Sequence, residues 1–121
     1  MSQTELALPP AISHFIEAMN RFDGAALLEP FLDDALVNDN KREFWGKAAI
    51  QKFADRELIG DKVTMAVTEV YDHYGQIIVS AKVDGEYDKT NLPDPLILTF
   101  YFTLHGDKIA TLFILYNKPA P

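Results

Sequence analysis

The hydrophobic residues of this chain change their spacing near residue 62, and this change limits the fold more than any other feature. Before it, apolar residues recur every three or four positions, which is the spacing of an amphipathic helix. After it, apolar and polar residues alternate, which is the spacing of a strand with one buried face. A run of helices followed by a run of strands favours an α+β architecture, with helices packed on an antiparallel sheet.

Three helices are expected in the first half of the chain. Pro9-Pro10 marks the start of the first helix, because proline is tolerated in the first turn. Asp23 is placed to cap a short second helix, which Pro30 should end. Residues 35–39 are predicted to form a short strand, and residues 46–59 the third helix.

Strands are expected over residues 62–74, 76–84, 96–105 and 108–117, with a polar loop at 88–95. The last two strands are apolar on both faces. In the final strand one face carries Leu112, Ile114 and Tyr116, and the other carries Ile109, Phe113 and Leu115. A sheet that is buried on both faces needs a layer packed against each face, and the helices supply only one such layer. We therefore expect a homodimer that packs through the outer face of the sheet.

Composition excludes several classes of function. The 121 residues carry a net charge of −7, which repels nucleic acid, and no cysteine is available for disulfides or thiolate chemistry. Three scattered histidines lack metal-ligand spacing, so we expect no metal site and no cofactor. Neither a signal sequence nor an apolar run of membrane-spanning length is visible. The expectation is a cytoplasmic protein of one domain, residues 1–121, with a flexible stretch at 1–8.

Four pieces of sequence carry a family resemblance through their order and spacing. They are Ala18-Met-Asn-Arg-Phe-Asp23, Phe31-Leu-Asp-Asp-Ala-Leu-Val-Asn-Asp39, Phe44-Trp-Gly-Lys-Ala-Ala-Ile50 and Phe102-Thr-Leu-His-Gly-Asp-Lys-Ile109. Together they resemble the nuclear transport factor two-like superfamily, in its SnoaL-like and ketosteroid-isomerase-like branch. The resemblance implies three N-terminal helices packed on a strongly curved antiparallel sheet, a cone-shaped, cystatin-like half-barrel with a pocket. It does not fix the chemistry, because this fold hosts isomerases, cyclases, dehydratases, epoxide hydrolases and binding modules.

The resemblance places Asp39 where isomerase-like members carry their catalytic base. A carboxylate at the mouth of an apolar cavity loses hydration, so its pKa rises and it can take a proton from carbon beside a carbonyl. The alternative is an ordinary aspartate at a strand end, capping a turn with Asn40. Arg42 is close enough in sequence to pair with Asp39, which would keep the carboxylate ionised.

Two positions depart from the isomerase pattern. In ketosteroid isomerase the base works with two proton donors that hold the developing oxyanion. The matching positions here are Phe15 and Phe100, which cannot donate a hydrogen bond. Loss of one such donor costs about 3–4 kcal/mol of transition-state stabilisation, so steroid isomerisation is disfavoured. Tyr116 is a candidate replacement donor if its hydroxyl points inward; the alternative is a tyrosine packed in the sheet with its hydroxyl at the rim.

The rest of the expected pocket wall is aromatic and aliphatic, and most of these residues serve equally as core. The candidate lining residues are Phe15, Met19, Phe31, Phe44, Trp45, Phe53, Phe100, Phe102, Leu112 and Ile114. Apolar walls with one acid suit a small hydrophobic molecule with a polar end. The sequence therefore supports a small-molecule lyase, isomerase or cyclase with Asp39 as base, or a non-catalytic dimeric protein that binds such a molecule.

Overall fold

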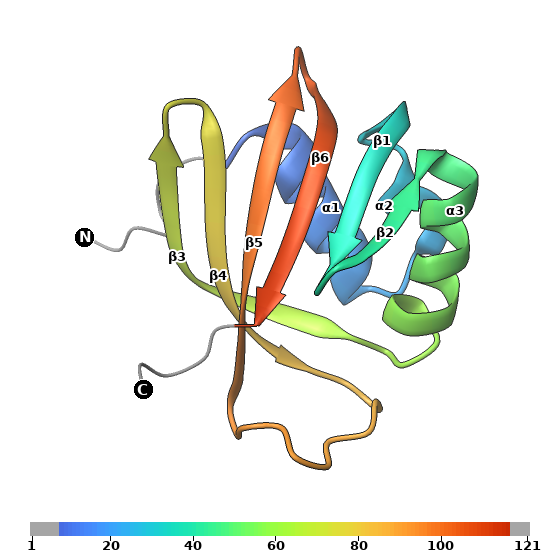
Figure 1. Ribbon diagram of the computed structural model, residues 1–121, viewed down its shortest axis with the longest axis vertical. Coiled ribbons are helices and arrows are strands. Elements are labelled where there is room, and N and C mark those ends of the chain that lie inside the picture. The colour runs from blue at the N-terminus through green and yellow to red at the C-terminus, as the bar shows by residue number, and fades with distance from the viewer. Residues whose placement is uncertain (1–7, 117–121) are drawn as a thin grey trace.

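The computed structural model describes residues 8–116 and, of Tyr116, the backbone only. Residues 1–7 of the expected flexible stretch lie outside this range, whereas Leu8 packs against the core. The fold is α+β, as predicted, with a six-stranded sheet in the order β2-β1-β6-β5-β4-β3 (Figure 1). The sheet is mixed rather than wholly antiparallel, because β1 runs parallel to β6. The helices are not consecutive, because two strands lie between the second and third of them.

The first two helices begin where the sequence predicts. α1 (Pro10–Asn20) has proline in its first turn, and α2 (Gly24–Leu28) is capped by Asp23, which accepts a hydrogen bond from the Ala26 backbone N–H at 3.0 Å. The buried face of α1 consists of Ala11, Ile12, Phe15, Ile16, Ala18 and Met19.

The predicted short strand at 35–39 is one part of a hairpin. β1 (Phe31–Asp39) is longer than expected, and it pairs with β2 (Arg42–Trp45), a strand that was not predicted from the sequence. Asn40 and Lys41 form the turn with positive φ angles of 51° and 80°, and the Asn38 side chain accepts a hydrogen bond from the Lys41 backbone. A four-residue, mostly exposed strand after a turn without glycine gives little signal in a sequence.

The third helix is not α-helical throughout. α3 (Gly46–Phe53) continues into a π-helical segment, η2 (Ala54–Ile59), which ends before Gly60 as predicted. Glu57 and Leu58 of η2 line the candidate site described below.

Two bulges change the alternation of the long strands. β3 (Thr64–His73) and β4 (Gln76–Asp84) form the predicted hairpin around Tyr74 and Gly75, but an extra residue at Thr68 puts Val70 on the buried face. β5 (Leu96–His105) and β6 (Lys108–Tyr116) have a second bulge at Ala110. Ile109 is consequently fully buried, which corrects its predicted place on the outer face.

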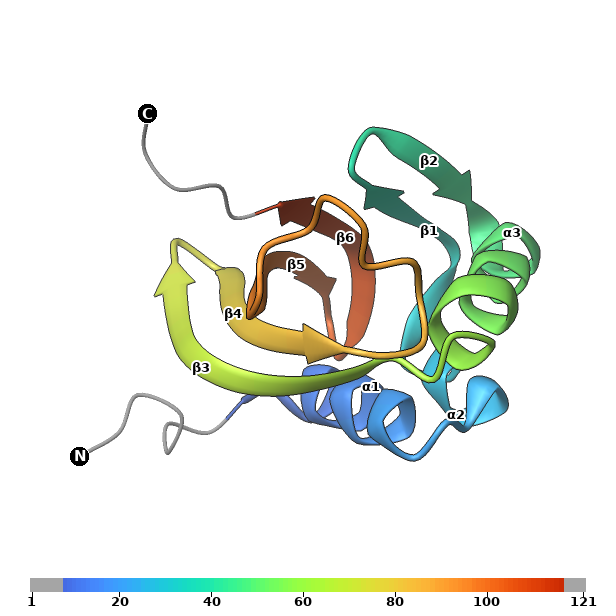
Figure 2. The ribbon, with the colours of Figure 1, turned by 90° about the horizontal axis from the view of Figure 1, so that it is seen from below.

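The sheet curls without closing, and its inner face packs against the helices (Figure 2). At the centre of the core Phe15 meets Phe31 and Phe102 edge to face, with ring centroids 5.7 and 5.6 Å apart. The loop of residues 85–95, which joins β4 to β5, passes across the curled sheet in Figure 2. Within residues 8–116, every helix is too short or too polar to cross a membrane.

Candidate functional site

A cavity of about 170 Å³, which we call the inner cavity, lies between the curled sheet, the α3–η2 segment and the loop 85–95. Its wall is mostly apolar, with three carboxylates and one phenol. The lining residues are Met19, Asp39, Phe53, Glu57, Leu58, Asp61, Val63, Val83, Tyr87, Leu92, Leu96, Leu98, Phe100 and Ile114. Seven elements and two loops contribute to this wall, so the cavity exists only in the folded chain.

Asp39 reaches the inner cavity from the last position of β1, where its neighbour on β6 is Ile114. Its side chain is 24% exposed. Burial raises the pKa of the Asp39 carboxyl, and the hydrogen bond and positive charge of Arg42 lower it by less. Asp39 is therefore a stronger proton acceptor than an ordinary surface aspartate.

Arg42 holds two of the three carboxylates together. Its guanidinium donates to both oxygens of Glu57, at 2.9 and 2.7 Å, and also to Asp39. It lies over the rings of Phe44 and Phe53, 5.6 and 5.9 Å from their centroids. The bond to Glu57 is the main reason that the pKa of Arg42 is raised, so this residue stays charged.

The cavity wall has more acid than base. Asp39, Glu57 and Asp61 all line it, whereas Arg42 supplies the neighbouring positive charge. A carboxylate accepts hydrogen bonds and protons, so this end of the cavity favours a ligand group that donates them.

Tyr87 supplies a phenol to the cavity wall from the loop 85–95. Its hydroxyl donates to the Val83 carbonyl at 3.2 Å, and burial is the main reason that the pKa of Tyr87 is raised. Tyr87 is therefore a neutral hydrogen-bond donor near neutral pH, already directed at a backbone acceptor.

The structure brings five of the predicted site residues together at the inner cavity: Met19, Asp39, Phe53, Phe100 and Ile114. Four others, Phe15, Phe31, Phe102 and Leu112, lie in the closed core, where each is at most 1% exposed. Phe44 stacks on Phe53 with ring centroids 4.5 Å apart. Trp45 is 62% exposed and donates to Glu43, so it lies on the surface rather than in the cavity wall. The side chain of Tyr116 lies outside the described residues.

Most of the other residues that line the inner cavity were not predicted from the sequence. Glu57 was assigned to a regular helix, and Tyr87 and Leu92 lie beside or within a segment interpreted as a polar loop. A tyrosine and a leucine among charged and proline residues gave little signal, because single apolar side chains are common on protein surfaces. Among residues 8–116, no group of three or more potential metal ligands is present.

Solved structures with similar folds span nearly the whole chain. A putative polyketide cyclase from Sinorhizobium meliloti is 28% identical, with a TM-score of 0.79 over 89% of this chain and 95% of that one. A protein with a ketosteroid isomerase-like fold from Catenulispora acidiphila, solved with trimethylamine, is 16% identical, with a TM-score of 0.78 over 92% and 88%. A Mycobacterium tuberculosis protein solved with estradiol-17β-hemisuccinate is 15% identical, with a TM-score of 0.73 over 88% and 91%. No protein-family model and no curated protein matches the sequence.

These likenesses confirm the resemblance predicted from the sequence. The neighbours include a putative polyketide cyclase, a nuclear transport factor two-like protein and a protein with a ketosteroid isomerase-like fold. They also include proteins that bind small molecules.

Proposed function

We propose that this chain, a nuclear transport factor two-like protein, binds a small and largely apolar molecule in the inner cavity, where Asp39 acts as a general base. The reaction class is that of a lyase, isomerase or cyclase. The observation that carries the proposal is the placement of Asp39 at an apolar cavity where burial raises its pKa.

The chemistry follows from that placement. A bound carbonyl compound would put an acidic C–H near Asp39, whose ionised form would take the proton. Arg42 would hold the carboxylate in position through their hydrogen bond, and Phe53 and Phe100 would hold the apolar body of the ligand. The curled sheet would act as the wall of a cone with the cavity inside it.

The neighbours support a ligand of this kind. Small molecules occupy two of them, and a third is described as a putative polyketide cyclase.

A second candidate function, binding without chemistry, is favoured by the scarcity of proton donors. Phe100 occupies the cavity wall where an oxyanion donor would help, and the hydroxyl of Tyr87 is already engaged with Val83. Without a donor for the developing negative charge, proton abstraction from carbon is slow.

Proton exchange distinguishes the two functions. The full chain is incubated with small cyclic ketones, starting with cyclohexanone, in deuterium oxide, and deuterium uptake beside the carbonyl is followed by NMR. A general base accelerates the uptake, and the rate rises as pH increases through the pKa of Asp39, because only the carboxylate accepts a proton. Asp39→Asn should abolish the acceleration, whereas Asp107→Asn, in the exposed turn between β5 and β6, should retain it.

The result that contradicts a catalytic role is equally clear. If the ketones bind and the wild-type chain exchanges no faster than Asp39→Asn, Asp39 is not a base and the protein is a binding module.

A further inference from the structure

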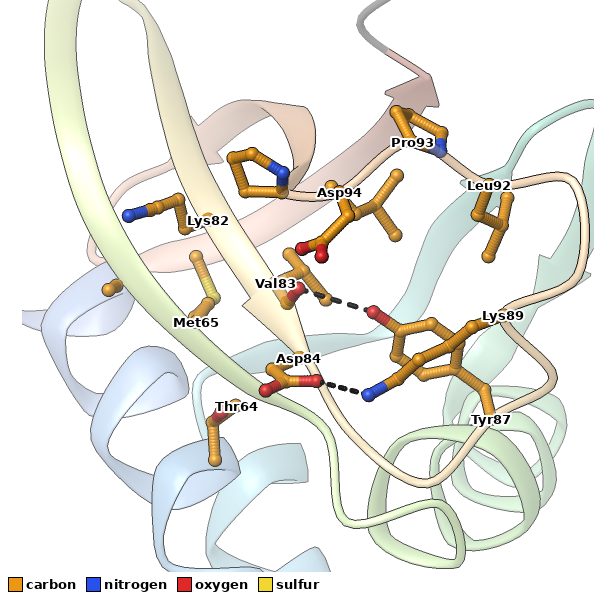
Figure 3. A pocket seen from close by; sticks show the side chains of 13 residues that line it. Thr64, Met65, Lys82, Val83, Asp84, Tyr87, Lys89, Leu92, Pro93 and Asp94 are labelled. Atoms are coloured by element: carbon orange, nitrogen blue, oxygen red, sulfur yellow. Dashed lines mark hydrogen bonds and ion pairs between the residues drawn. The ribbon is translucent and has the colours of Figure 1, made fainter.

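A second hollow, the outer pocket, adjoins the inner cavity. Its volume is about 720 Å³, and it is bordered by the start of β3, the end of β4 and the loop 85–95 (Figure 3). Val83, Tyr87, Leu92 and Leu96 belong to the walls of both hollows. The two hollows therefore share part of their lining.

The inner cavity is small for a complete ligand site. Pockets that enclose a small molecule usually measure about 300–1,000 Å³, and the inner cavity has about 170 Å³. A ligand that places one end beside Asp39 has room for a larger remainder only if it extends past Tyr87 and Leu92 into the outer pocket.

The loop that forms the shared wall is fastened at its start. The Glu86 backbone N–H donates to the Asp61 carbonyl at 2.6 Å, so the loop is tied to a residue that itself lines the inner cavity. Gly85 permits this approach, because a Cβ at that position would lie 2.8 Å from the same carbonyl oxygen.

Tyr87 is held in place within the shared wall. In addition to the bond from its hydroxyl to Val83, the Lys89 ammonium lies 5.6 Å from the centroid of its ring. Lys89 also pairs with Asp84 at 2.7 Å, as drawn in Figure 3. A fixed partition of this kind selects ligands by shape.

The charges of the outer pocket balance. Its wall contains Lys82 and Lys89, and also Asp84 and Asp94. Thr64 adds a hydroxyl, and Met65, Leu92 and the prolines supply apolar surface. A wall without excess charge and with both donors and acceptors favours uncharged groups that form hydrogen bonds.

We propose that the two hollows form one binding site for an elongated amphipathic molecule. One end, an apolar ring with a group that donates a hydrogen bond to Asp39, lies in the inner cavity. The other end is uncharged, forms hydrogen bonds and lies in the outer pocket, with Tyr87 and Leu92 setting the width of the passage. This inference rests on the proposed function of the inner cavity and names the class of ligand that the whole site accepts.

The test uses phenols that share one head group and differ in their tail. p-Cresol has no polar tail, 3-(4-hydroxyphenyl)propanamide has a neutral one, 3-(4-hydroxyphenyl)propanoate an anionic one and tyramine a cationic one. Affinities for the full chain are measured by titration calorimetry at neutral pH. The amide should bind about tenfold more tightly than p-cresol, and the two charged compounds should gain much less.

Two variants locate the tail. Ala66 is exposed on β3 and lines the outer pocket, so Ala66→Trp should fill that space and reduce the affinity ratio of amide to p-cresol to about one. Ala48→Trp, at an exposed position of α3, should preserve the wild-type ratio. Amide NMR shifts of the wild-type chain give a second readout. The propanamide should shift the backbone amide signals of Lys82 and Asp94, whereas p-cresol should leave them unchanged.

The outcomes separate the two proposals. If p-cresol fails to bind, the proposed function of the inner cavity fails and this inference fails with it. If p-cresol binds but the neutral tail adds no affinity, or a charged tail adds as much, the inference alone is overturned. An unchanged ratio in Ala66→Trp also overturns it.

Discussion

The carboxyl group of Asp39 lies among charges whose effects single substitutions can separate. Burial and the negative charge of Glu57 raise its pKa, whereas the hydrogen bond and charge of Arg42 lower it. Each effect has a definite sign, and each partner can be replaced by an uncharged glutamine of similar size.

Opposite shifts are expected from the two replacements. Arg42→Gln should raise the pKa of Asp39 further above its ordinary value of 3.8, because both of the lowering effects come from Arg42. Glu57→Gln should lower it, because a neighbouring negative charge is removed. Carbon-13 NMR titration of the aspartate carboxyl measures the pKa directly, and shifts of the same sign in both variants would contradict this arrangement.

At this scale the sequence predicted some partners and not others. Asp39 stands at the end of an apolar run, and Arg42 is three positions further on, so their pairing was foreseeable. Glu57 is fifteen positions beyond Arg42, and their contact joins η2 to β2. A contact between distant elements leaves no mark in hydrophobic spacing, so Glu57 was absent from the predicted site.

The elements of the fold followed the alternation of the sequence wherever the ladder was regular. In β4, Ile77, Val79, Ala81 and Val83 are all buried, as their spacing of two predicts. In β3 and β6 the extra residue of a bulge shifts the alternation. Val70 and Ile109 are therefore buried in the core, although regular alternation would place them on the outer face. A single sequence contains no marker for either bulge, and this is why these two faces were incompletely predicted.

One side chain fastens the helical layer to the edge of the sheet. The amide of Asn20, at the end of α1, donates to the Met65 carbonyl at 3.0 Å and accepts from the Met65 backbone N–H at 2.8 Å. Met65 belongs to β3, the edge strand, so these bonds satisfy backbone groups that would otherwise lack a strand partner.

Removal of that amide should loosen the contact between α1 and β3. Asn20→Ala should lower the free energy of unfolding by about 1–3 kcal/mol, because two hydrogen bonds are lost at a partly buried position. Urea denaturation measures the change. Gln51→Ala, at an exposed position of α3, serves as the control and should change the free energy by less than about 0.5 kcal/mol. Equal effects of the two substitutions would show that the Asn20 contact contributes nothing.

For the whole molecule, the order of helices and strands predicted the α+β architecture. The superfamily was predicted from that order together with four short pieces of sequence. The cavity wall was harder to predict. It combines side chains from α1 to β6, and its closing residues, Tyr87 and Leu92, come from the loop 85–95. Loop conformation depends on long-range contacts such as that between Glu86 and Asp61, which no local pattern encodes.

The outer sheet face remains the basis for the expected homodimer. Ile78, Tyr101 and Phe113 are direct neighbours across β4, β5 and β6, and Leu115 lies two residues along β6 from Phe113. All four are partly or largely exposed in the single chain. We expect light scattering to give twice the chain mass of 13.6 kDa.

A charge within that face should prevent association. Phe113→Arg places a guanidinium among apolar neighbours, and its burial in an interface is unfavourable, so this variant should have the mass of one chain. Gln51→Arg adds the same charge on α3 and should leave the mass doubled. A wild-type protein that is monomeric at micromolar concentration would contradict the expected dimer.

A crystal structure of the full chain soaked with p-cresol would show whether the inner cavity holds a ligand beside Asp39. We expect density for the ring between Phe53 and Phe100, with the phenolic oxygen at hydrogen-bond distance from the Asp39 carboxylate. A cavity filled by the protein's own side chains, or an Asp39 carboxylate turned into solvent, would contradict it.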